Sequence, residues 1–110
     1  MLIEHGADPM AEMYDKETPL HLTVERGRVD VARILIEHGA DVMAWNKDRK
    51  TPLHLASEQG QVDLARMLIE CGADPMAKTY DEKTPLHLAS EWGRVDIARI
   101  LIERGAKVNA

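Results

Sequence analysis

Apolar residues follow one another at helical spacing in a block that recurs along the chain. In its first occurrence, Val29, Ala32, Leu35 and Ile36 are separated by one, three or four residues, the spacing that places side chains on one face of an α-helix. Asp30 stands in the first turn, where the helix dipole favours a negative charge. The pattern predicts an amphipathic helix with one buried face.

A shorter helix is predicted directly before this one. Thr18 can cap a helix with its hydroxyl group, and Pro19 occupies the first helical position, where no backbone amide hydrogen is needed. Leu20 and Leu22 then place apolar surface on one side, and Gly27 can end the helix in a left-handed conformation. The two helices together form a pair.

The helix pair returns at a fixed period. The pentapeptide TPLHL begins at Thr18, Thr51 and Thr84, which are 33 residues apart, and self-similarity at such a period indicates a repeat architecture. The turn-rich segment ADVMAWNKDRK that follows the second helix is predicted to project as a hairpin-like finger. One helix pair cannot bury its own apolar face, so about three repeats must stack. We therefore divide a single domain of residues 1–110 into a partial repeat and three further repeats: residues 1–17, 18–50, 51–83 and 84–110.

The units resemble ankyrin repeats over the whole chain. The T-P-L-H opening, a glycine nine residues after the threonine, the V-D-x-A-R-x-L-I-E block and the G-A-D ending fall in register. This resemblance implies an all-α solenoid of stacked antiparallel helix pairs joined by β-hairpin-like finger loops. It also implies a concave face, lined by finger tips and first helices, that contacts other proteins. Because both chain ends fall in the same part of the unit, we expect a segment of a longer array or an engineered protein.

Two columns depart from the family pattern. The finger carries Lys16, Arg49 and Glu82 where the family usually has glycine. A side chain held in a left-handed conformation costs about 1 kcal/mol, so we expect a looser turn or another turn type. A usual asparagine is replaced by methionine, which we expect to fill the core, with a wider contact surface as the alternative. These methionines are Met10, Met43 and Met76.

Histidine is the residue type that most suggests catalysis or metal binding. His21, His54 and His87 occupy one column of the repeat, and stacked helices place equivalent side chains about 10 Å apart, too far to share a metal bound at about 2 Å. We expect each ring to hydrogen-bond backbone or cap groups at a repeat junction. His38 and Cys71 share another column and are expected to be exposed. The sequence therefore predicts no catalytic residue, no metal site, no cofactor and no enzyme activity.

Composition narrows the range of partners and compartments. The net charge of −5 argues against a nucleic-acid partner, whose phosphates require a basic face. No apolar run approaches the roughly 20 residues of a membrane span. Cys71 is the single cysteine, so no intrachain disulfide can form, and we expect a cytoplasmic, reducing compartment.

The positions that differ between repeats are concentrated in the fingers and at the end of the first helix. All four aromatic residues of the chain stand at such positions, and tyrosine and tryptophan are enriched at interface hot spots. We expect Trp45, Tyr80 and Trp92 to anchor a partner. The full set of predicted partner-binding residues is Tyr14, Arg26, Trp45, Lys47, Asp48, Lys50, Gln59, Tyr80, Asp81 and Trp92.

These patterns predict a non-catalytic protein–protein interaction module that binds through its concave face. The sequence does not identify the partner. The alternative is a structural or engineered repeat scaffold that self-associates end to end, as a homo-oligomer, through uncapped terminal repeats. An engineered folding model without a biological partner has the same predicted fold.

Overall fold

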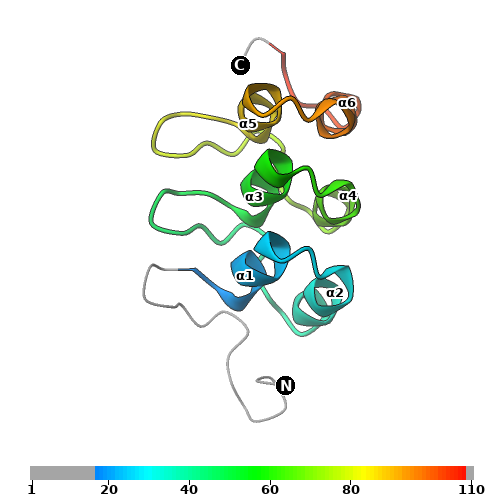
Figure 1. Cartoon of the computed structure of the whole chain (residues 1–110). Coiled ribbons are helices and arrows are strands. Elements are labelled where there is room, and N and C mark those ends of the chain that lie inside the picture. The colour runs from blue at the N-terminus through cyan, green and yellow to red at the C-terminus, as the bar shows by residue number, and fades with distance from the viewer. Residues whose placement is uncertain (1–16, 109–110) are drawn as a thin grey trace.

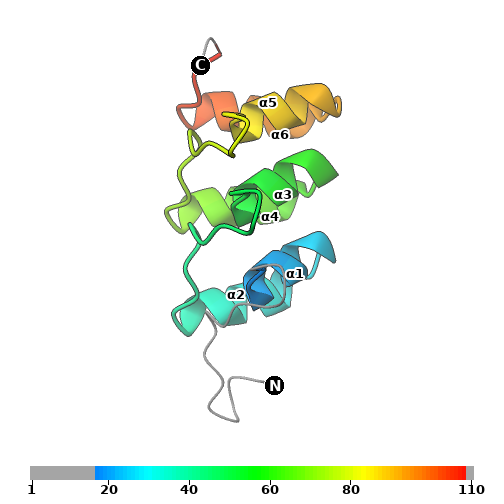
Figure 2. The same cartoon turned by 90° about the vertical axis from the view of Figure 1, so that its left-hand side faces the viewer.

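The computed structural model describes residues 17–108, and within this range three helix pairs are stacked in a row (Figure 1). The first helices form one column and the second helices form another, and the loops before α3 and α5 project to the same side (Figures 1 and 2). The six helices of the described range are α1 (Pro19–Glu25), α2 (Val29–Glu37), α3 (Pro52–Gln59), α4 (Val62–Glu70), α5 (Pro85–Glu91) and α6 (Val95–Glu103). This arrangement confirms the predicted all-α solenoid of stacked helix pairs.

Each first helix begins with the same reciprocal cap. Thr18 Oγ1 accepts a hydrogen bond from the His21 amide at 3.4 Å, and His21 Nδ1 accepts one from the Thr18 amide at 3.1 Å. Such a capping box satisfies two amides that the helix leaves without intrahelical partners. The same box is present at Thr51 and Thr84, so the predicted threonine cap is confirmed in all three repeats.

The second helix of each pair starts after a very short turn. Gly60 ends α3 with a φ of 72°, a left-handed conformation that glycine adopts without steric cost. The residue preceding α4, Gln61, makes no side-chain cap, and Asp63 supplies the negative charge in the first turn. The chain reverses here within two residues, which allows the two helices of a pair to lie side by side (Figure 1).

The core is continuous from the first described repeat to the last. Its fully buried aliphatic residues include Leu20, Leu53, Leu64, Leu68 and Leu101. No aromatic side chain is among the buried apolar residues of the described range. In residues 17–108 no helix has the length and apolar character needed to traverse a bilayer.

The methionines of the finger base pack between repeats. Met43 and Met76 are partly buried against the core. Their sulfur atoms also accept backbone amides of the following repeat, Met43 Sδ from Asp74 at 3.1 Å and Met76 Sδ from Lys107 at 3.3 Å. The core-filling prediction is confirmed for these two residues, whereas Met10 lies outside the described range.

The finger loops are hydrogen-bonded turns. We call residues 41–50 the first finger and residues 74–83 the second finger; residues 17–108 contain no β-strand. The first finger is closed by Asn46 N to Lys50 O at 3.1 Å and Arg49 N to Asn46 O at 2.9 Å. The equivalent second-finger bonds join Thr79 to Lys83 at 3.0 Å and Glu82 to Thr79 at 2.9 Å. The loops are therefore hairpin-like in their hydrogen bonds without forming strands.

The expectation of a looser or different turn in the fingers is wrong. Arg49 and Glu82 adopt the left-handed conformation, with φ values of 61° and 63°. The cost of about 1 kcal/mol for each residue is accepted because the two turn hydrogen bonds of each finger require that conformation. Lys16, the third residue of this column, lies outside the described range.

Candidate functional site

Two histidines of the column each tie a described finger to the first helix of the same repeat, α1 or α3. His21 Nε2 is 2.9 Å from the carbonyl oxygen of Lys50, and His54 Nε2 is 3.0 Å from that of Lys83. Because Nδ1 of each ring accepts a backbone amide, the proton must reside on Nε2, which donates to the carbonyl. Both ring nitrogens are thus engaged in structural hydrogen bonds, which confirms the predicted role of these two histidines.

His54 is completely buried in this arrangement. Burial lowers the pKa of His54 below its usual value, and the hydrogen bond to the Lys83 carbonyl opposes this effect. A neutral ring is required here because Nδ1 must remain an acceptor for the Thr51 amide. Within residues 17–108, no group of three histidine, cysteine or acidic side chains is arranged to hold a metal ion.

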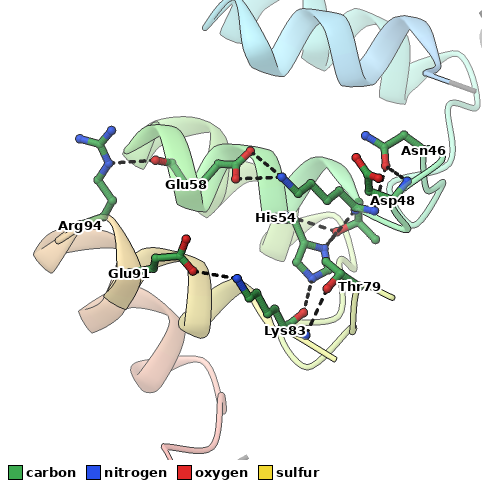
Figure 3. Close-up of polar contacts among 10 residues, drawn as sticks. Asn46, Asp48, His54, Glu58, Thr79, Lys83, Glu91 and Arg94 are labelled. Carbon is green, nitrogen blue, oxygen red and sulfur yellow. Dashed lines mark hydrogen bonds and ion pairs between the residues drawn. The ribbon is translucent and has the colours of Figure 1, made fainter. Parts of the chain in front are cut away.

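Lysine–glutamate pairs connect the end of each described finger to the next helix. Lys50 Nζ lies 3.1 Å from Glu58 Oε2, and Lys83 Nζ lies 3.0 Å from Glu91 Oε1 (Figure 3). The hydrogen bond to Glu91, together with its charge, raises the pKa of Lys83. The two pairs are 33 residues apart and repeat the same contact on successive helices.

Arg49 joins the tips of the two fingers. Its guanidinium lies 4.9 Å from the ring centroid of Trp45 and 4.9 Å from that of Tyr80, within cation–π range of both. The Tyr80 amide also donates to the Asp48 carbonyl at 3.3 Å across the same junction. The fingers are therefore linked by aromatic and backbone contacts.

A hollow of about 350 Å³ lies between the fingers and the helices α3 and α5. We call it the finger groove. Its lining residues are Asp48, Lys50, Glu58, Thr79, Tyr80, Asp81, Lys83, Leu88, Glu91 and Trp92. The loop after α5 is held beside α3, since Arg94 Nε donates to the Glu58 carbonyl at 3.0 Å (Figure 3).

The finger groove brings together half of the residues expected to bind a partner. These are Asp48, Lys50, Tyr80, Asp81 and Trp92. Trp45 does not line the groove but lies beside it through Arg49.

The remaining predicted residues lie elsewhere. Lys47 is exposed on the first finger, Arg26 is exposed at the end of α1, and Gln59 is half-buried at the end of α3. None of these three lines the groove. Tyr14 lies outside the described residues.

Sequence reasoning missed Arg49 as a member of this surface. It occupies a column in which the family usually has glycine, but it also stands four residues after Trp45 and in the finger that precedes Tyr80. The sequence did contain a signal for this contact: a cationic residue with one aromatic residue in its own finger and another in the next finger. The groove residues Glu58, Lys83 and Glu91 were also not predicted.

A second hollow of about 240 Å³ lies on the outer face of the last described repeat. It is lined by Thr84, Leu86, His87, Ser90, Ala98, Ile102, Lys107 and Val108. His87 keeps its cap bonds to Thr84 but is exposed, unlike His21 and His54. In the part of the chain that is described, no carbonyl is bonded to His87 Nε2.

The repeated helix pair, its capping box and its projecting fingers define a helical repeat protein. Residues 1–79 match the family model for ankyrin repeats in three copies, and residues 81–110 match the model for a single ankyrin repeat. The chain belongs to the ankyrin-repeat family. No curated protein matches it in a sequence comparison. Ankyrin repeats are generally protein–protein interaction modules and are typically not catalytic.

Proposed function

We propose that this protein binds a partner protein through the concave face formed by its fingers and first helices. Trp45, Tyr80 and Trp92 anchor the partner. The polar contacts come from Tyr14, Arg26, Lys47, Asp48, Lys50, Gln59 and Asp81. Catalysis has no part in this function.

The exposure of the aromatic side chains carries the proposal. Trp45, Tyr80 and Trp92 are 53%, 66% and 57% exposed, whereas the described core is built without aromatic residues. Large aromatic side chains that gather on one surface mark interaction sites, because covering them in a complex is favourable. Two of the three border the finger groove, which gives a partner side chain a place to enter.

The test compares two sets of substitutions in exposed apolar residues. The triple variant Trp45→Ala, Tyr80→Ala, Trp92→Ala should lose binding to a partner protein isolated with the wild-type chain, while its helical circular dichroism is retained. The control variant Val31→Ala, Val95→Ala removes exposed apolar groups from second helices and should bind as wild type. Unchanged binding of the triple variant would refute the proposal.

We also propose that this binding takes place in the cytoplasm. Cys71 is exposed and free, and an exposed thiol persists most readily in a reducing compartment. Labelling of Cys71 by a thiol reagent in intact cells that express the protein checks this point. A blocked thiol in freshly lysed cells would argue against it.

A second candidate function is end-to-end self-association. The observation that favours it is the apolar outer face of the last described repeat, where Ile102 and Val108 are 47% and 70% exposed beside His87. In the interior repeats the equivalent histidine is bonded to a finger carbonyl, so a repeat of another copy would have a matching contact to offer. Sedimentation velocity at several concentrations tests this: Ile102→Lys should abolish any concentration-dependent dimer, and a wild-type chain that stays monomeric throughout contradicts it.

A further inference from the structure

We propose that the finger groove receives an arginine side chain of the partner, so that the segment bound there is basic. This inference rests on the proposed function of the concave face and specifies the chemistry that the face recognises. It is carried by the charges, the aromatic rings and the size of the groove.

Two carboxylates of the groove, those of Asp48 and Asp81, are not held in an ion pair by residues 17–108. Its lining contains four acidic residues and two lysines. Lys50 is paired with Glu58, and Lys83 with Glu91. Asp48 and Asp81 stand at the tips of adjacent fingers, are exposed, and their carboxylates make no hydrogen bond or ion pair within the described range. The groove thus offers a net negative charge to an incoming cation.

One aromatic ring of the groove, that of Tyr80, already contacts a guanidinium within this molecule. Arg49 places its guanidinium 4.9 Å from the Tyr80 centroid, so the ring already accepts a planar cation. Tyr80 and Trp92 remain more than half exposed on the groove. A second guanidinium can use this remaining aromatic surface.

Arginine fits this combination better than lysine does. Its planar guanidinium stacks on aromatic rings and binds a carboxylate through two parallel hydrogen bonds, whereas the ammonium of lysine is compact and strongly hydrated. The groove volume of about 350 Å³ lies near the lower end of the range for ligand pockets, roughly 300–1,000 Å³. One long side chain therefore fits in the space, flanked by Asp48 and Asp81.

The first test is an NMR titration of the ¹⁵N-labelled full chain with N-acetyl-arginine methylamide. We expect shift changes at the amides of Tyr80 and Asp81 and at the indole of Trp92, with an affinity on the order of millimolar for so small a probe. The lysine and glutamate analogues are titrated in parallel and should give weaker and no changes, respectively. Equal changes with lysine, or no change with arginine, would overturn the assignment.

Two charge-matched variants locate the interaction. Asp48→Asn, Asp81→Asn should weaken the arginine response at least about tenfold, which corresponds to about 1.4 kcal/mol. Asp63→Asn, Asp96→Asn removes the same charge from exposed positions on second helices and should keep the response. A response that survives the first pair of substitutions, or is lost equally with the second pair, contradicts the proposal. The dispersion of each spectrum reports whether the variant is folded.

A peptide selection separates this inference from the proposed function. Random phage-displayed peptides are selected on the immobilised wild-type chain and then tested against the triple aromatic variant. Arginine enrichment among peptides that fail to bind the triple variant supports both proposals. Peptides that need the aromatic residues but are not enriched in arginine overturn the arginine assignment alone. Peptides that bind the triple variant as well as the wild type overturn the proposed face itself.

Discussion

The two fingers have the same backbone hydrogen bonds but differ in the side chains that support the turn. In the first finger, Asn46 Oδ1 accepts the amides of Asp48 and Lys50 at 2.9 and 3.0 Å. In the second, Thr79 Oγ1 accepts only the Lys83 amide, at 3.2 Å. The turn hydrogen bonds are nevertheless the same in both, so the backbone frame is independent of the side chain that braces it.

The residue with the left-handed backbone is also better supported in the first finger than in the second. Arg49 stacks on Trp45 and Tyr80, whereas the Glu82 side chain makes no hydrogen bond, ion pair or ring contact inside residues 17–108. Contacts of Arg49 with two rings offset its backbone strain, but Glu82 has no such compensation. The first finger is therefore the better-braced of the two, and the following predictions test this difference.

The largest effect is expected where the second finger is tied to α3. Replacing His54 with Ala removes a fully buried ring and its bonds to Lys83 and Thr51, which should destabilise the protein by about 3 kcal/mol. His87→Ala, at an exposed ring with cap bonds only, should cost about 1 kcal/mol. Urea unfolding measures both, and equal losses would show that the finger tie contributes little.

The next largest effects are expected for the side chains that support the finger turns, Asn46 and Thr79. Asn46→Ala leaves two amides of the first finger without their acceptor at a buried position, and a loss of about 2 kcal/mol is expected. Thr79→Ala removes one such bond and should cost about 1 kcal/mol. Chemical denaturation of the two variants, with exposed Lys78→Ala as control, checks the order. A larger loss for Thr79→Ala would reverse the ranking of the fingers.

Acidification should loosen the second finger without breaking its tie completely. The pKa of His54 is lowered in the folded state by burial, so the unfolded chain binds the proton more readily and stability falls as pH drops below about 6.5, the usual histidine value. The loss should be smaller than that of His54→Ala, because a protonated ring still donates from Nε2 to Lys83. Urea titrations between neutral and mildly acidic pH, on wild type and His54→Gln, measure this. An equally steep decline in both proteins would assign the effect to other groups.

The smallest effect concerns the left-handed residues. Glu82→Gly relieves strain at a φ of 63° and should stabilise the protein by about 0.5 to 1 kcal/mol. Arg49→Gly relieves the same strain but loses two ring contacts worth about 0.5 to 1 kcal/mol each, so no gain or a small loss is expected. Thermal unfolding of the two variants decides whether Arg49 compensates for its own conformation.

The period of the sequence was sufficient to predict the helices and their caps. Thr18, Pro19 and Gly27 mark the limits of α1 through local chemistry, and the histidine contacts join each first helix to the last residue of the same repeat, at the junction with the next. The shape of the finger turns was not predicted, because the cost of a side chain at Arg49 or Glu82 was weighed without the hydrogen bonds that the turn would keep.

The sequence predicts only some of the groove residues, and the reason is not the one that applies to the finger turns. Arg26, Gln59 and Trp92 occupy one column of the repeat, yet only Trp92 lines the groove. Equivalent positions are indistinguishable in the periodic pattern, whereas the lining of this groove depends on how α3, α5 and the two described fingers meet. The contact of Arg49 with Tyr80 likewise depends on how adjacent finger tips meet in space.

The hydrogen bonds of His21 and His54 end on carbonyl oxygens of the main chain. A carbonyl is present whatever amino acid occupies the end of the loop, so the anchor places no demand on side-chain identity there. A finger from another repeat could therefore replace the native one. It would bring different surface side chains and still accept the same hydrogen bond from the histidine ring. The surface that binds a partner can thus be changed without changing the hydrogen bonds that hold the finger in place.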